Sequence, residues 1–184
     1  TKLDMIVDTS GYKKQCIVIR TDQKNEANFE VQDFPLKKEI TMNQKDILQH
    51  ITDSGIVGLG GATFPSHVKL DLKNDNKVDC LIINGVECEP YLTADHRLML
   101  EKADEIIVGI QILMHALHIK EAVIGIENNK KDAIVVLKQA AQSDNRIKVA
   151  ALQVKYPQGS EKQLIKAIIK REIPKGGLPM DVGV

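Results

Sequence analysis

The chain has 184 residues, of which 43% are hydrophobic and 27% are charged. These are ordinary values for a folded globular protein, so the composition argues against a disordered chain. Lysine plus arginine equals aspartate plus glutamate, 25 against 25, which leaves no net field to attract nucleic acid. No apolar run approaches the ~18 residues of a membrane-spanning helix, and the start lacks a signal-peptide pattern. We therefore expect neither a nucleic-acid partner nor a membrane span in this sequence.

The cysteines and histidines indicate neither a disulfide framework nor a metal site. Cys16, Cys80 and Cys88 lie too far apart for the paired CxxC spacing of zinc and iron–sulfur sites. A set of Cys80, Cys88 and His96 has regular spacing but lacks a second close pair, and the other histidines are scattered at no ligand spacing. We therefore predict no metal site in this sequence and a reducing compartment.

The first 38 residues are interpreted as the end of a preceding β-rich domain and a linker. One convincing strand is predicted at 15–21 and a weaker one at 28–32. This segment is too short to enclose a core of its own, so we expect residues 39–184 to form a separate domain. The chain starts without methionine and stops in mid-pattern at Val184, and we therefore expect it to be a piece of a longer protein.

From Met42 onward, apolar strands alternate with amphipathic helices. A first helix is predicted at 44–52, capped by Asn43 or Thr41 and stopped by Gly55. The later elements are strands at 78–84, 121–127 and 148–154, and helices at 94 to about 117, 130–141 and 161–170. This order is typical of an α/β fold with a parallel sheet covered on both faces. Ligands of such sheets bind at the carboxyl ends of the strands.

A glycine-rich loop within residues 55–70 is the first candidate for a ligand site. It places four glycines within seven positions, and glycines let backbone N–H groups approach a phosphate or a flat ring. The loop matches neither nucleotide pattern: Thr63 stands where GxGxxG requires a glycine, no Gly-Lys-Ser/Thr closes a P-loop, and a helix precedes the loop. Pro65 suits the first turn of a new helix. Lys69 can reach back towards an anion, with a solvated lysine beside a plain turn as the alternative.

A second candidate, Asn84-Gly85-Val86-Glu87-Cys88-Glu89-Pro90, follows the first predicted strand of the sheet. Glu87 and Glu89 project to the same side if this segment is extended. Two glutamates two positions apart rarely face each other across a scissile bond, which argues against a paired-carboxylate hydrolase. We interpret the carboxylates as acceptors of hydrogen bonds from hydroxyl or amide groups of a polar ligand, with a solvated acidic turn as the alternative.

The third candidate, Tyr156-Pro157-Gln158-Gly159-Ser160-Glu161, lies at the carboxyl end of the last predicted strand. Ser160 or Gly159 can cap the helix that follows, and the free N–H groups of that helix favour an anion. A plain connection with a helix cap is the alternative. Three glycine-bearing loops at one sheet edge predict an extended ligand with rings and phosphates.

In their order and spacing, the three loops resemble a known family. This is the family of flavin-binding subunits that includes the 51-kDa-type NADH-oxidising subunit of respiratory complex I. Its GxGGxGFP-like, Asn-x-x-Glu-x-Glu-Pro and Tyr-x-x-Gly-x-Glu segments stand here as GLGGATFP from Gly58, NGVECEP from Asn84 and YPQGSE from Tyr156. The wider stretches GIVGLGGATFP, NGVECEPYLTADHRLM and YPQGSEKQLI are similar to the C subunit of Rnf-type electron-transport complexes. The resemblance covers about residues 43–184.

The resemblance implies an α/β domain with a parallel sheet that holds FMN non-covalently and stacks NADH on the flavin, preceded by a β remnant of a barrel-like domain. The residues expected to cradle the flavin and its phosphate side are Gly58, Gly60 and Lys69. Those expected at the ribityl chain or ring edge are Asn84, Glu87 and Cys88, with Tyr156 and Gly159 closing the pocket. Those expected on the NADH side are Phe64, Glu89 and Glu161. The flavin itself carries the redox chemistry, so no side chain need act as an acid or base.

The resemblance also implies a place in a larger assembly. Subunits of this kind pass electrons between NADH and ferredoxin through FMN and 4Fe-4S clusters, coupled to ion movement. The clusters would lie in the full-length subunit but outside this sequence. We therefore expect an NADH-linked oxidoreductase/translocase subunit, peripheral at the cytoplasmic side of the inner membrane. Its partners would be the other subunits, with ferredoxin an indirect partner, and the fragment alone is not expected to complete the reaction.

Three residues depart from the family pattern. Thr63 replaces a glycine, Val86 stands where complex I has an aspartate, and Ser160 replaces an acidic or glycine residue. Two other functions stay open. The first is a docking module of the complex that keeps the fold but binds no redox cofactor, and the second is a nucleotide-binding enzyme outside the redox classes.

Overall fold

The structure is a computed structural model that describes residues 2–7, 11–18, 35–59, 62–72 and 78–184. The chain divides into two units, Thr1–Pro35 and Leu36–Val184. In the first unit, β1 (Lys2–Val7) and β2 (Lys13–Val18) form an antiparallel hairpin. β2 overlaps the strand predicted at 15–21, whereas the charged residues of β1 concealed that strand from the sequence pattern. The strand predicted at 28–32 lies outside the described residues, and the barrel-like origin of this unit stays a prediction.

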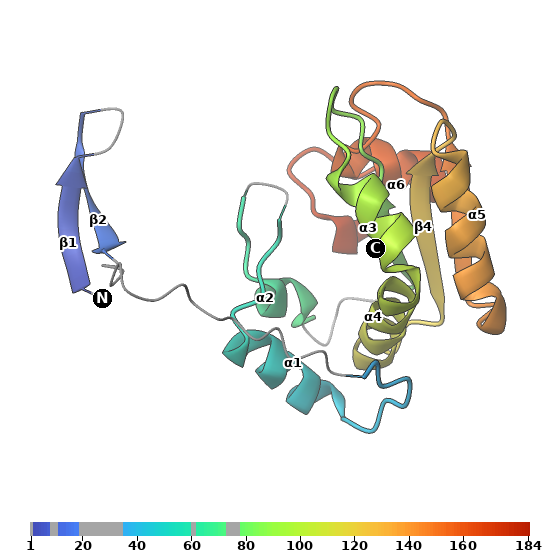
Figure 1. Cartoon of the computed structure of the whole chain (residues 1–184), viewed down its shortest axis with the longest axis horizontal. Coiled ribbons are helices and arrows are strands. Elements are labelled where there is room, and N and C mark those ends of the chain that lie inside the picture. The colour runs from blue at the N-terminus through green and yellow to red at the C-terminus, as the bar shows by residue number, and fades with distance from the viewer. Residues whose placement is uncertain (1, 8–10, 19–34, 60–61, 73–77) are drawn as a thin grey trace. The chain divides into compact units, whose positions relative to one another are not determined.

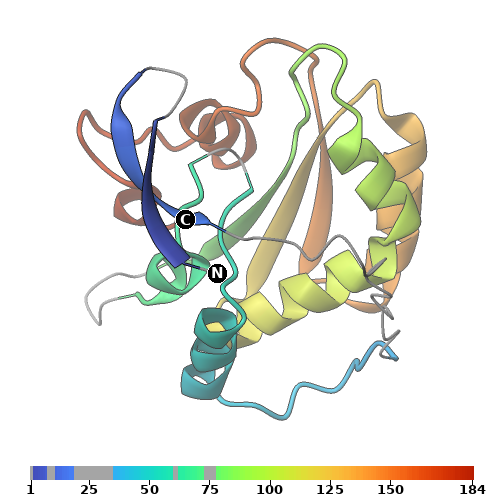
Figure 2. The ribbon, with the colours of Figure 1, turned by 60° about the vertical axis from the view of Figure 1, so that its left-hand side comes forward.

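The second unit is built on a parallel sheet of three strands in the order β3, β4, β5, which lie side by side in Figure 2. β3 spans Cys80–Gly85, β4 spans Glu121–Glu127 and β5 spans Ile147–Leu152. In the register of the sheet, Cys80 lies opposite Glu121 and Ala122 lies opposite Ile147. The predicted parallel sheet is therefore confirmed. β4 has the predicted bounds, and the ends of β3 and β5 differ from the prediction by at most two residues.

Helices lie on both faces of this sheet (Figures 1 and 2). The α-helices are α1 (Gln44–Asp53), α2 (Ser66–Leu70), α3 (Ala94–Glu101), α4 (Ala103–Ala116), α5 (Lys131–Ala140) and α6 (Glu161–Ile169). Short 3₁₀ helices span Ala141–Ser143 and Pro179–Val182. One core lies between the sheet and α3, α4 and α5, and a second, smaller core lies between the sheet and α6. In the part of the chain that is described, no helix has the length and apolar character needed to cross a membrane.

The central strand β4 shows how side-chain alternation builds the two cores. Ala122, Ile124 and Ile126 belong to the core with α4 and α5, and each is at most 1% exposed. The residues between them face α6, because successive side chains of a strand point to opposite faces. At Gly125, a Cβ atom would lie 2.9 Å from Cδ1 of Leu164. α6 therefore packs directly on the backbone of β4, and this contact requires glycine.

The helix predicted from 94 to about 117 is in fact two helices. α3 ends at Glu101 and α4 begins at Ala103, and Lys102 between them has φ −129° and ψ 30°. α3 contacts β3 and α5, whereas α4 contacts α1, β4 and α5. The prediction of one helix was wrong because the apolar pattern continues through residue 102, with no Gly or Pro to signal a break.

α1 and α2 flank the glycine-rich loop. Asn43 caps α1 as predicted, since its Oδ1 accepts a hydrogen bond from the backbone N–H of Asp46 at 3.0 Å. Pro65 is the N-cap residue of α2, with ψ 120°, so this short helix begins one residue later than expected, at Ser66. The loop between the two helices is therefore held at both ends by regular structure.

Asp144 fixes the turn between α5 and β5. Its carboxylate accepts hydrogen bonds from Arg146 Nε at 2.8 Å, from Arg146 Nη2 at 2.7 Å and from Gln111 Nε2 at 3.0 Å. The side chain of Asp144 is only 9% exposed, and the contact with Gln111 ties α4 to the start of β5. The guanidinium of Arg146, above all, holds the pKa of the Asp144 carboxyl well below its usual range.

We expect Asp144→Asn to lower the free energy of unfolding by about 1–2 kcal/mol at neutral pH, because it removes charge-assisted hydrogen bonds whose arginine is half exposed. The stabilisation is complete above the unfolded pKa of about 4 and is lost as the pH falls towards the lower folded pKa. The difference between the two proteins should therefore shrink below about pH 4. Urea unfolding across this range measures it, with the exposed Asp71→Asn as control. An equal difference at neutral and acid pH would contradict the assignment.

Candidate functional site

Two of the three predicted loops are joined at the carboxyl edge of the sheet. Nδ2 of Asn84, near the end of β3, donates a hydrogen bond to the carbonyl oxygen of Gly159 at 2.9 Å. The N–H of Gly159 in turn donates to Sγ of Cys88 at 3.4 Å. The N–H of Val86 donates to Oδ1 of Asn84 at 3.1 Å. Residues 84–90 and 156–160 therefore form one structure, which we call the edge site.

Gly159 is the closest point of contact between the two loops. A Cβ atom at this position would lie 2.7 Å from the carbonyl oxygen of Val86 and 3.4 Å from Sγ of Cys88. Any side chain would push the loops apart and break the hydrogen bonds of Asn84. The glycine is therefore required by packing, a role that neither the predicted helix cap nor the expected place at the pocket had indicated.

Glu87 is buried, with 8% of its surface exposed. Its Oε1 accepts a hydrogen bond from the N–H of Asp95 at 2.9 Å, and its Oε2 accepts one from the N–H of His96 at 3.3 Å. Both donors lie in the first turn of α3, where unpaired N–H groups and the helix dipole favour a negative charge. Burial, and then the nearby carboxylate of Glu87, raise the pKa of Asp95. Glu87 thus caps α3 from the preceding loop. The sequence did not predict this role, because a helix cap is expected at the residue next to the helix and Glu87 lies seven positions before Ala94.

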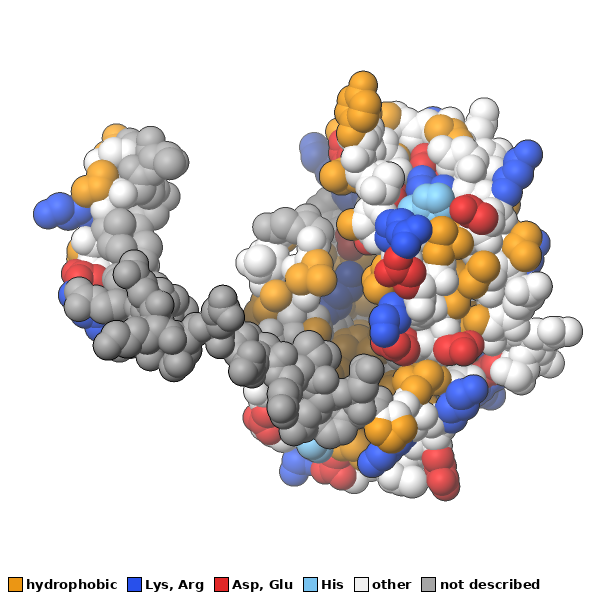
Figure 3. Space-filling view, in the orientation of Figure 1, with side chains coloured by type: hydrophobic (Ala, Val, Ile, Leu, Met, Phe, Trp, Pro, Cys, Tyr) orange, Lys and Arg blue, Asp and Glu red, His pale blue; other side chains and the backbone are white. Residues whose placement is uncertain are grey.

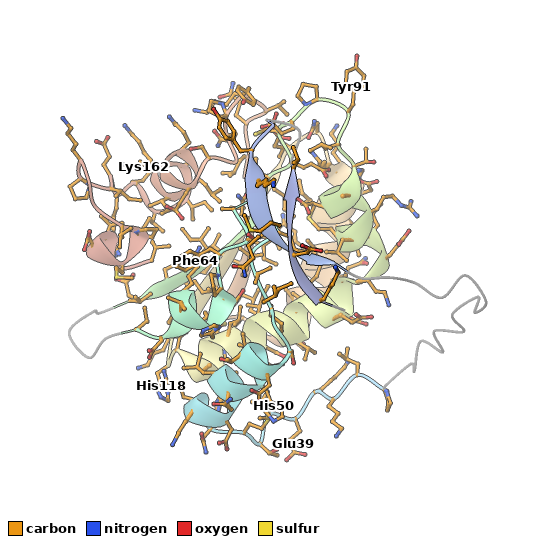
Figure 4. The ribbon with its side chains drawn as sticks, turned by 90° about the vertical axis from the view of Figure 1, so that its left-hand side faces the viewer. Glu39, His50, Phe64, Tyr91, His118 and Lys162 are labelled. Carbon is orange, nitrogen blue, oxygen red and sulfur yellow. The ribbon has the colours of Figure 1, made fainter. Side chains whose placement is uncertain are left out.

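The outer part of the edge site is open to solvent. Glu89 is exposed whereas Glu87 is buried, so the two carboxylates have different surroundings. Tyr156 is 68% exposed. Tyr91 has φ 67° and lies at the tip of the loop after β3, where its side chain points away from the rest of the unit (Figure 4).

Eight of the residues expected at the cofactor or at NADH line one of two hollows, whereas Gly58 and Phe64 line neither. One hollow, within the edge site, is lined by Val86, Glu87, Cys88, Glu89, Leu92, Asp95, Tyr156, Pro157, Gly159 and Ser160. The other is a cavity of about 190 Å³ between α2, β3 and α6, whose polar lining is provided by Lys69, Asn84 and Glu161. Asn84 lies between the two, because its side chain lines the cavity and bonds the edge site. A ligand that contacts all of these residues must therefore be long enough to span both hollows.

The glycine-rich loop is closed at its base by main-chain hydrogen bonds. The N–H of Gly58 donates to the carbonyl oxygen of Phe64 at 2.8 Å, and the N–H of Ser66 donates to that of Ile56 at 3.1 Å. Thr63 has φ 50°, in the left-handed region that a β-branched residue rarely adopts. Phe64 is half exposed and lies beside α2 (Figure 4). Gly60 lies outside the described residues.

Lys69 connects the end of α2 with the start of α6. Its Nζ lies 3.9 Å from Oε2 of Glu161, and the two side chains are 69% and 54% exposed. At this distance and exposure the pair contributes little to stability. The lysine is therefore available to an anion that enters the cavity beside it.

Charged side chains of both signs lie on the surface of the second unit (Figure 3). On the face shown in Figure 3, Lys and Arg side chains are interspersed with Asp and Glu side chains, in agreement with the formal net charge of +0. Within the described ranges, no three His, Cys, Asp or Glu side chains are grouped as metal ligands. Cys80 is buried at the start of β3, and burial raises the pKa of its thiol. The set of Cys80, Cys88 and His96 is accordingly not assembled as a site.

Comparison with known families gives a match that covers this whole region. The family model described as "Nuo51 FMN-binding domain" matches residues 51–184. The match includes the glycine-rich loop, both loops of the edge site, and every strand of the parallel sheet.

Several known proteins are similar to the chain over nearly its full length. The C subunit of the Na(+)-translocating ferredoxin:NAD(+) oxidoreductase complex of Acetobacterium woodii is 45% identical over 175 residues, 95% of this chain and 39% of that protein. The C subunit of the proton-translocating ferredoxin:NAD(+) oxidoreductase complex of Clostridium ljungdahlii is 48% identical over 97% of this chain and 40% of that protein. The C subunit of the ion-translocating oxidoreductase complex of Vibrio cholerae is 45% identical over 179 residues, 97% of this chain and 22% of that protein.

These relatives confirm the predicted resemblance to the C subunit of an electron-transport complex. The chain spans less than half of the length of each of them. Among solved structures, an NAD+-reducing nickel–iron hydrogenase in its H2-reduced state matches 67% of this chain and 23% of its own, with a TM-score of 0.59 and 25% identity. On the family match and the relatives together, the chain belongs to the family of Nuo51 FMN-binding domains.

Proposed function

We propose that the chain is the FMN- and NADH-binding part of an ion-translocating electron-transport complex. In the whole complex, electrons would pass between NADH and ferredoxin through FMN and through 4Fe-4S clusters that lie outside this sequence. The other subunits would hold the chain at the cytoplasmic side of the inner membrane. The observation that carries the proposal is the joining of residues 84–90 to residues 156–160 at the sheet edge, in a chain of the FMN-binding family.

The groups around the two hollows suit the parts of FMN. Lys69 is an exposed cation beside the cavity, where it can bind a phosphate. Carboxylate and amide oxygens near Asn84 can accept hydrogen bonds from the hydroxyls of a ribityl chain. The apolar lining of the cavity, which includes Leu70, Ile82 and Leu164, suits a flat ring.

In this proposal the residues have three kinds of role. Gly58, Gly60 and Lys69 cradle the flavin and its phosphate. Asn84 and Cys88 contact the ribityl chain or ring edge, and Tyr156 and Gly159 close the pocket. Glu87 holds the loop in place by its hydrogen bonds to the first turn of α3. Phe64, Glu89 and Glu161 bind NADH on the outer side, in agreement with the exposure of all three. When bound, FMN would supply the hydride-transfer and single-electron chemistry, and these residues would hold and orient it.

A docking module without a cofactor is the second candidate function. It is favoured by the hydrogen bonds that Asn84 makes to Gly159 and that Glu87 makes to α3, because these polar groups are already bonded within the protein. It is also favoured by exposed apolar side chains at the tips of loops, above all Leu59 and Tyr91. On this hypothesis the glycines serve only as turns and close contacts, and the chain binds neither FMN nor NADH.

A fluorescence titration separates these two functions. We expect FMN to bind saturably and Lys69→Ala to weaken FMN about tenfold or more, because a hydrogen bond to a charged group contributes about 1.5–3 kcal/mol. Riboflavin, which lacks the phosphate, should bind the parent and Lys69→Ala equally. Lys138→Ala, which removes an exposed lysine of α5, is the matched control. Absence of FMN binding by the parent chain would favour the docking module.

Glu87→Ala should behave differently from Lys69→Ala in the protein without flavin. Glu87 accepts two hydrogen bonds from the first turn of α3, and loss of such a cap costs about 1–2 kcal/mol. We therefore expect a lower melting temperature for Glu87→Ala and an unchanged one for Lys69→Ala. Calorimetry without ligand measures both, and Glu89→Ala, an exposed neighbour, is the control. Unchanged melting of Glu87→Ala would show that the cap contributes nothing.

A further inference from the structure

A buried ion pair lies beside the edge site and has no part in the cofactor contacts described above. Nζ of Lys130 lies 3.0 Å from Oε2 of Glu127, and the two side chains are 10% and 2% exposed. Glu127 ends β4, and Lys130 immediately precedes α5. Burial of a charge costs free energy that even a good partner only partly offsets. The presence of this pair in the interior therefore needs an explanation other than stability.

Lys130 makes a second contact, which reaches the edge site. Its Nζ donates a hydrogen bond to the main-chain carbonyl oxygen of Glu87 at 3.2 Å. Glu87 is thus held from two sides, since its carboxylate binds α3 and its carbonyl group binds the segment between β4 and α5. Lys130 also affects the pKa of Asp95. Burial and then the Glu87 carboxylate raise this pKa, and the positive charge of Lys130 acts in the opposite direction.

The environment of Glu127 argues that the pair does more than stabilise the fold. Its Oε1 atom is buried and has no hydrogen-bond partner among the residues that the structure describes, which leaves part of its desolvation cost uncompensated. Apolar residues of similar volume often replace a buried ion pair without loss of stability. What an apolar pair cannot supply is a donor to the carbonyl oxygen of Glu87.

We propose that Lys130 is a positioning residue of the edge site. It fixes the main chain of Glu87, and with it residues 86–88, in the conformation that receives FMN; the proposal therefore rests on the proposed function. Glu127 accepts a hydrogen bond from the same Nζ atom, and a glutamine at residue 127 can still accept that bond. Lys130 acts only through Glu87 and does not itself touch the cofactor.

Three variants separate positioning from stability. Lys130→Met removes the donor and leaves Glu127 as an unpaired buried charge. The double variant of Lys130→Met with Glu127→Gln removes the donor and both charges of the pair. Glu127→Gln alone keeps the donor and is the control. Each variant of the full chain is measured by FMN titration, by thermal unfolding without FMN, and by visible circular dichroism of FMN bound at saturation.

We expect the double variant to melt near the temperature of the parent but to bind FMN about tenfold more weakly, which corresponds to about 1.4 kcal/mol. The circular dichroism of its bound flavin should also differ from that of the parent. Lys130→Met should lose both stability and affinity, because an unpaired buried charge is strongly destabilising. Glu127→Gln should keep the FMN affinity of the parent whatever its melting temperature.

Hydrogen exchange without FMN tests the same contact independently of the cofactor. The amides of Asp95, His96 and Gly159 report on the loop that Lys130 holds. They should exchange faster in both variants that lack the lysine and at the parent rate in Glu127→Gln. If the parent itself fails to bind FMN while exchange follows this pattern, the proposed function is wrong and the positioning of the loop by Lys130 still holds.

Parent-like FMN affinity or parent-like amide exchange in the double variant would overturn the proposal. Either result would mean that the carbonyl group of Glu87 keeps its place without the lysine. The ion pair would then contribute to stability alone.

Discussion

Parallel strands place all of their carboxyl ends at one edge of a sheet, and the loops of the second unit are arranged by this constraint. β3, β4 and β5 are neighbours in sequence order, so helices must return the chain after each strand. The segments that leave the three strands then emerge together. Asn84 and Gly159, 75 positions apart, become hydrogen-bonded neighbours. Lys130 reaches the carbonyl group of Glu87 from the turn that follows β4, the middle strand.

At this edge, most polar groups are satisfied by other parts of the protein before any ligand is present. Asn84 bonds both loops of the edge site, Glu87 caps α3, and the N–H of Gly159 is bound to a sulfur atom. Such contacts reduce the freedom that the loops would lose when a ligand binds, and pre-organisation of this kind favours affinity. Glu89 and Tyr156, in contrast, are exposed to solvent, so their side chains can contact a ligand while the buried groups hold the loops in place.

The sequence predicted the architecture well because its signals are local or periodic. Apolar runs identified the three strands, and β4 was predicted residue for residue. The break at Lys102 and the buried pair of Glu127 and Lys130 could not be predicted, since they depend on which side chains meet in three dimensions. The same limit applies to Glu87: the carboxylate was identified as a binding group, but its partners lie on a helix that begins seven residues later.

Gly125 shows how the centre of the sheet sets the geometry at its edge. α6 rests on the backbone of β4 at this residue, with Leu164 against the place where a side chain would stand. The segment 156–160 leads directly into α6, so the depth at which the helix is seated determines how closely Gly159 approaches Val86. A single methyl group at residue 125 would lift the helix and widen the gap between the two loops. The close contact between Gly159 and Val86 at the surface thus depends on the lack of a side chain at residue 125 in the interior.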